Sequence, residues 1–160
     1  MIEILSFLGL IFGIFISKIS KEELKDWERY FDVAYSFLLI IIAVLIFDFS
    51  YMILLGILIG FFLYFILKNI YFYFGLLLSV NGFVLPLVVL IFIIGLVYSR
   101  KFIDLTRERI ILEVMKSFVI FIIPFVLVFF GDFVLSYNVI LNGICIGAFL
   151  HAIKEYIKRH

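Results

Sequence analysis

Cysteine is nearly absent from the sequence, since Cys145 is its only cysteine. A disulfide within the chain is therefore excluded, and the redox state of the compartment cannot be read from cysteine usage. The start of the sequence also lacks a basic segment, because Glu3 is the only charged residue before Lys18. With no small-residue cleavage site there either, the first apolar run differs from a secretory signal peptide and is expected to be retained as a helix.

Charged residues are scarce as well, at 16% of the sequence, and the net charge is +1. This balance argues against a nucleic-acid partner, which binds to a cationic surface. No Lys, Arg, Asp or Glu lies in the middle of an apolar run of spanning length. Ion pumps and proton relays usually carry such a residue, so an active transporter is disfavoured.

Motifs for cofactors and metals are also missing. The sequence has no glycine-rich phosphate loop and no Ser-His-Asp arrangement with any positional logic. Its two histidines, His151 and His160, do not have the Cys/His spacing of a metal site. We therefore expect no cofactor and no bound metal.

Two acidic residues are the only candidates for catalysis inside a membrane. Asp48 and Asp132 could share a proton and perform acid/base chemistry. Gly131-Asp132 resembles the end of the Gly-x-Gly-Asp motif of prepilin peptidases and presenilin-like proteases, but Phe129 occupies the position of the first glycine. Because both acids follow apolar runs, we interpret them as caps in short helix connections, and an intramembrane enzyme is a remote alternative.

Apolar residues, in contrast, are abundant at 67% of the sequence, where a soluble domain has about half. A helix that crosses the hydrocarbon layer needs about 20 residues. We predict an all-α fold, a polytopic integral membrane helical bundle that forms a single transmembrane domain over residues 1–160. The predicted spans cover about residues 2–18, 30–47, 51–67, 113–131 and 133–153.

Residues 70–98 do not fit this scheme, since their 29 residues are too many for one comfortable span and too few for two. The 13 basic residues favour one solution. If the segment crosses once, they divide five to eight across the membrane; if it turns back, all lie on one face. Basic residues in short loops are biased to the cytoplasm. We therefore predict five spanning helices plus one membrane-penetrating helical hairpin at about 70–98, with six spanning helices as the alternative.

This topology places the protein in the cell membrane, with the N-terminus outside and the C-terminus in the cytoplasm. The turn of the hairpin is predicted at Asn81-Gly82, with Pro86 in the first turn of the second arm. Arms of about 14 residues reach roughly 20 Å into a layer of about 30 Å, so the tip stops short of the far side. Broken helices of this kind line substrate sites in transporters.

Three Gly-x-x-x-Gly motifs are expected to pack helices closely, because small residues four apart form a flat groove. Packing within one subunit is the expected role, and contact between copies of the chain is the alternative. The motifs are Gly9–Gly13, Gly56–Gly60 and Gly143–Gly147.

Asn138 and Asn142 lie four residues apart in the last predicted helix. An amide in hydrocarbon needs a hydrogen-bond partner, so both are expected to be buried against other helices. A ligand or ion contact is the alternative. Two mixed-charge segments, near residues 18–30 and 99–113, are expected to be solvated; docking of a partner or of anionic lipid headgroups is the alternative there.

These observations favour a non-enzymatic scaffold or accessory subunit of a membrane complex, in contact with the lipid bilayer and with other membrane subunits or itself. The alternative is a small transporter or channel subunit that uses the 70–98 hairpin. The substrate or partner does not follow from the sequence.

Overall fold

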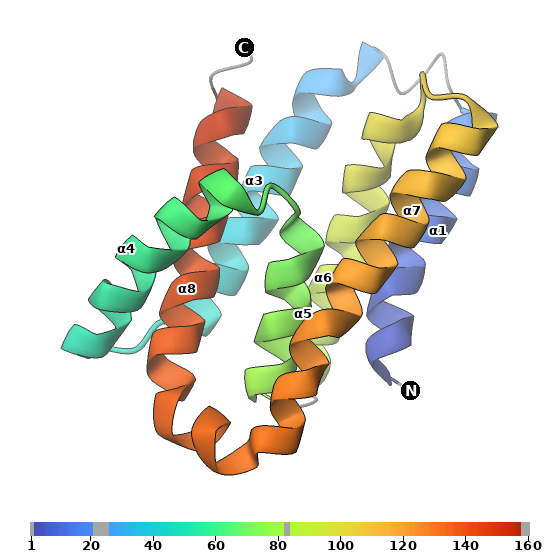
Figure 1. The fold of residues 1–160 in the computed structure, drawn as a ribbon. Helices are drawn as coiled ribbons and strands as arrows, with labels where there is room; N and C mark the ends of the chain where they lie inside the picture. The colour runs from blue at the N-terminus through green and yellow to red at the C-terminus, as the bar shows by residue number, and fades with distance from the viewer. Residues whose placement is uncertain (1, 21–25, 82–83, 158–160) are drawn as a thin grey trace. The chain divides into compact units, whose positions relative to one another are not determined.

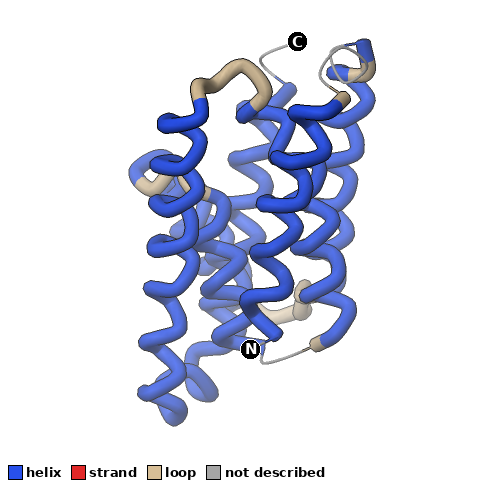
Figure 2. Tube along the Cα trace, turned by 90° about the vertical axis from the view of Figure 1, so that its right-hand side faces the viewer, coloured by secondary structure: helices blue, strands red, loops and turns tan. Residues whose placement is uncertain are grey.

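The computed structural model describes residues 2–20, 26–81 and 84–157, and the regular structure in these ranges is all helical (Figures 1 and 2). This confirms the predicted all-α class. The helices are α1 (Ile2–Ile19), α3 (Glu28–Leu45), α4 (Tyr51–Ile66), α5 (Ile70–Asn81), α6 (Leu85–Tyr98), η1 (Ser99–Phe102), α7 (Arg107–Ile122), η2 (Ile123–Phe130) and α8 (Gly131–Ile157).

Three helical stretches in the described part of the chain are long and apolar enough to cross a membrane. They are Leu85–Phe102, Arg107–Leu127 and Ser136–Ile157. Shorter apolar helices cover Leu5–Ile19, Tyr51–Ile66 and Ile70–Asn81. The helix α3 overlaps most of the predicted span at 30–47 but ends at Leu45, and it begins with charged Glu28, Arg29 and Asp32.

Residues 70–98 contain two helices rather than one. The helix α5 ends at Asn81, and α6 begins at Leu85 with Pro86 in its first turn. Proline fits this position because its missing N–H has no helical partner there. Gly82, the other predicted turn residue, lies outside the described residues.

Pro124 interrupts the predicted span at 113–131. The α-helix of α7 ends at Ile122, and the chain continues as the 3-10 helix η2, with proline in its first turn. A proline inside an α-helix removes one hydrogen bond and crowds the preceding turn. The predicted connection at Gly131-Asp132 is wrong, because both residues belong to α8. Figure 1 shows the chain turning through η2 instead.

The predicted cap at Asp48 is also wrong. The residue that caps α4 is Ser50, whose Oγ accepts a hydrogen bond from the Met52 N–H at 3.3 Å. Ser50 has the extended backbone of an N-cap, with φ of −127° and ψ of 145°. The backbone carbonyl of Asp48 accepts from the Ser50 N–H, which closes the turn before the helix.

The chain divides into two compact units. The first contains residues 1–38 and 83–116, and α1 packs along α6 within it. Leu10, Ile91 and Ile94 are fully buried, and Tyr35 lies against Tyr98 with ring centroids 5.8 Å apart. An ion pair joins Arg100 Nη2 to Asp32 Oδ1 at 3.4 Å. The basic end of η1 is thereby tied to the start of α3.

The second unit contains residues 39–82 and 117–160, and α8 is its centre, because α4, α5 and η2 all pack against it. The helix α5 is almost entirely buried, with Tyr71, Tyr73, Phe74 and Leu77 inaccessible to solvent. Cys145 of α8 is buried against it and donates from Sγ to the Tyr73 carbonyl at 3.4 Å.

Candidate functional site

Four glycines bring α4 and α8 together. A Cβ atom on Gly143 would lie 2.9 Å from the Gly56 Cα, and one on Gly56 would lie 2.9 Å from the Gly143 Cα. Gly60 faces the backbone of Ile144 in the same way, and Gly147 faces that of Ile57. The two backbones are therefore in direct contact, and a larger side chain at these positions would force them apart.

The remaining Gly-x-x-x-Gly motif brings α1 against α6. Gly9 faces the backbone of Phe92, and Gly13 faces Leu96 and Ser99. Gly95 of α6 returns the contact, since a Cβ atom there would lie 2.6 Å from the Leu10 nitrogen. Each of the three motifs thus lies in a helix contact within a single unit.

Asn81 and Asn142 form a reciprocal pair of amide hydrogen bonds. Asn81 Nδ2 donates to Asn142 Oδ1 at 2.7 Å, and Asn142 Nδ2 donates to Asn81 Oδ1 at 3.2 Å. Asn81 Nδ2 also donates to the Leu77 carbonyl at 3.0 Å, within α5. The end of the first arm of the predicted hairpin is therefore attached to α8, and both amides are satisfied without a ligand.

Asn138, one turn before Asn142, is exposed, in contrast to the expectation that it is buried against another helix. The spacing of four residues predicts a shared face, but α5 extends along α8 only as far as Asn142, because it ends at Asn81. Pro86 lies in the first turn of α6 and its side chain is exposed.

His151 lies among aromatic side chains, an arrangement that the sequence does not predict. Its ring centroid is 4.5 Å from that of Phe61 and 5.2 Å from that of Tyr64. Nδ1 lies 2.8 Å from the Phe61 carbonyl oxygen, so this nitrogen carries the proton and donates it. Nε2 is 4.0 Å from Glu155. The sequence signal was only that His151 follows Gly143 and Gly147 on one helix face.

The two acidic candidates belong to different parts of the second unit. Asp48 is exposed in the turn before α4, and Asp132 is in the first turn of α8. Among the described residues, no three His, Cys, Asp or Glu side chains form a group that could hold a metal ion.

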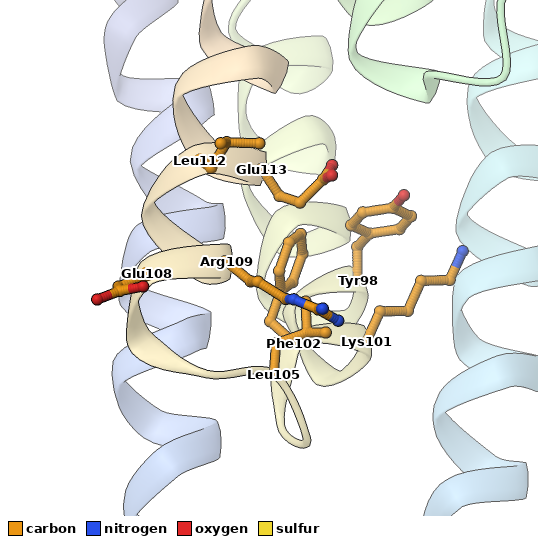
Figure 3. A pocket seen from close by; sticks show the side chains of 8 residues that line it. All are labelled: Tyr98, Lys101, Phe102, Leu105, Glu108, Arg109, Leu112 and Glu113. Atoms are coloured by element: carbon orange, nitrogen blue, oxygen red, sulfur yellow. The ribbon is translucent and has the colours of Figure 1, made fainter.

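A cleft of about 690 Å³ lies where α6 and η1 meet the start of α7 (Figure 3). Its apolar wall contains Phe102 and two leucines, and four charged residues surround it. The lining residues are Tyr98, Lys101, Phe102, Leu105, Glu108, Arg109, Leu112 and Glu113. The sequence predicts only a mixed-charge segment in this region. The sequence feature that indicates the cleft is the spacing of Arg109 and Glu113, which lie one helical turn apart.

Comparison with known proteins gives no relative, because no family model, no curated protein and no solved structure matches the chain.

Proposed function

We propose that the protein is a multi-pass protein of the cell membrane that serves as a non-enzymatic scaffold or accessory subunit of a membrane complex. The helix α4 carries this proposal, because it is apolar on every side. Its inner side, with Ile53, Gly56 and Gly60, is buried. Its outer side is exposed and consists of large apolar side chains. They are Leu54, Leu55, Leu58, Phe62, Phe65 and Ile66.

A helix that is hydrophobic all round belongs in a protein core or in a membrane. The outer side of α4 therefore faces lipid, a helix of another subunit, or a second copy of the chain. Small membrane subunits that bind a larger complex need such a surface. The satisfied amide pair and the glycine contacts support a structural role too, since they hold helices together.

Photo-crosslinking from α4 in native membranes tests this role. With benzoylphenylalanine at Phe62, which is 65% exposed, we expect an adduct with a second polypeptide. The same substitution at Phe149, which is fully buried in α8, is the matched control and should give none. Lipid adducts alone at position 62, together with purification as a monomer without partners, would contradict the scaffold role.

The proposed arrangement in the membrane has five spanning helices and a hairpin made by α5 and α6, with the N-terminus outside and the C-terminus in the cytoplasm. It is supported by the distribution of basic residues and by the length of α5. Twelve residues rise only about 18 Å, too little to cross the hydrocarbon layer.

The second candidate function is a small transporter or channel subunit. The interruption between α5 and α6 favours it, because broken helices that end inside the bilayer are typical of transport sites. In this case Asn81→Ala should change solute flux in reconstituted vesicles, while Asn138→Ala should not. Unchanged flux in both variants would leave the pair of amides with a structural role alone.

A further inference from the structure

The cleft at the start of α7 has balanced charges. Lys101 and Arg109 are cationic, and Glu108 and Glu113 are anionic. Lys101 is already engaged, because its Nζ lies 4.4 Å from the centroid of the Tyr98 ring, the geometry of a cation–π contact. The aromatic face of Tyr98 is therefore covered.

Arg109 and Glu113 are different. Among the described residues, neither has a hydrogen bond or ion pair, although they lie four residues apart on α7. Such residues are neighbours on a helix surface, with Cβ atoms about 5–6 Å apart. Figure 3 shows both on the side of α7 that faces Tyr98, whereas Glu108 points away. In the described part of the chain, Arg109 and Glu113 are thus a cation and a carboxylate that are neighbours in the cleft without being paired.

The position of the cleft indicates what reaches it. It joins the end of Leu85–Phe102 to the start of Arg107–Leu127, two stretches of spanning length connected by four residues. So short a connection keeps both ends on one face of the membrane. This holds whether α6 crosses the bilayer or returns from within it. Leu105 and Leu112 add an apolar wall beside the charges.

We infer that this cleft binds the headgroup of phosphatidylethanolamine, with the phosphate on Arg109 and the ammonium group on Glu113. The phosphate and the amine are joined by two carbons, a length that suits neighbouring side chains on one helix. An anionic headgroup without an amine would leave Glu113 facing negative charge. A choline headgroup cannot donate a hydrogen bond to Glu113, and the ring that would attract it is covered by Lys101. The inference depends on the membrane location proposed above but not on the scaffold role.

Native mass spectrometry of the detergent-purified protein tests this site, with phosphatidylethanolamine, phosphatidylcholine or phosphatidylglycerol added in turn. We expect phosphatidylethanolamine to be retained most strongly. Arg109→Gln and Glu113→Gln should each weaken its binding about tenfold, the effect of losing one charge-assisted hydrogen bond. Arg107→Gln is the matched control, since Arg107 is exposed outside the cleft, and should leave binding unchanged.

Arg109→Lys distinguishes a loss of lipid recognition from a loss of folding. It keeps the charge and should restore most of the binding lost in Arg109→Gln. Equal retention of the three lipids, or equal binding by Arg109→Gln and Arg107→Gln, would overturn the inference. Preference for phosphatidylglycerol with displacement by inorganic phosphate would also overturn it, because that result describes a simple anion site. None of these outcomes depends on a partner protein, so the scaffold role can fail while the lipid site stands.

Discussion

Asparagine side chains inside apolar helices are costly unless both ends of the amide are satisfied, and the pair Asn81–Asn142 meets this condition with two bonds between the side chains. The sequence correctly indicated that Asn142 needs a partner. It could not identify that partner, since 61 residues separate the two amides. The sequence also predicts that Asn138 is buried like Asn142. In the structure, only Asn142 lies beside the end of α5.

Replacement of the paired amide should therefore destabilise the fold. Asn142→Ala leaves the groups of Asn81 without their partner, and we expect a loss of about 1–2 kcal/mol in the free energy of unfolding. Asn138→Ala, one turn away on the same helix, should have little effect because Asn138 is exposed. Thermal unfolding in detergent measures both. Similar losses in the two variants would show that the amide pair has no special stabilising role.

A second residue-level prediction concerns the turn before α4. Ser50→Ala removes the side-chain cap on the Met52 N–H and should cost about 0.5–2 kcal/mol. Asp48→Ala, the cap expected from the sequence, should change stability by much less, since Asp48 is exposed. Chemical denaturation of the two variants gives the comparison. A larger loss for Asp48→Ala would mean that its carboxylate, and not Ser50, stabilises the turn.

At the scale of helices, the breaks have local causes. Pro124 and Pro86 lack the N–H that a helix interior requires, and both occur in the first turn of a new helix. The cap at Asp48 and the connection at Gly131-Asp132 were wrong for a related reason. A carboxylate and a neighbouring hydroxyl are both good caps, and a glycine can start a helix as well as end one, so composition does not decide between them.

The sequence does not identify which helices the Gly-x-x-x-Gly motifs contact. A Gly-x-x-x-Gly motif indicates a surface for close approach, and each of the three motifs faces a backbone. Nothing in the motif at Gly9–Gly13 shows that α6 is its partner. That pairing depends on how the whole chain folds, and the same is true of the cleft, whose lining residues come from α6, η1, the connection after η1, and α7.

Replacing a glycine with alanine tests the close contact between α4 and α8. A Cβ atom at Gly60 would overlap backbone atoms of Ile144, which cannot move aside like a flexible side chain. Gly60→Ala should therefore cost about 1–3 kcal/mol. Gly131→Ala is the control, because no atom beyond its chain neighbours and the backbone of its own helix lies within 4 Å of its Cβ position, and it should leave stability unchanged or slightly raised. Thermal unfolding that is equally affected by both substitutions would contradict this contact.

For the whole molecule, the proposed topology predicts where the chain can be labelled. In a Cys145→Ala background, Lys68→Cys and Lys101→Cys should react with a membrane-impermeant reagent from the same face, because α5 and α6 return to it. Phe49→Cys, at a position that is 97% exposed, should react from the opposite face. Labelling of positions 68 and 101 from different faces would replace the hairpin with a sixth span.

Each unit is made of two segments that are far apart in the sequence, and this affects how the protein is synthesised. Gly9 meets Phe92, which follows it by 83 residues, and Gly60 meets Ile144, which follows it by 84. At synthesis rates of roughly 5–20 residues per second, each glycine groove waits on the order of ten seconds for the helix that fills it. During that interval the grooves of α1 and α4 are open to other chains. Assembly with the wrong neighbour is therefore a risk that this order of helices creates, and slower translation between residues 60 and 144 would increase it.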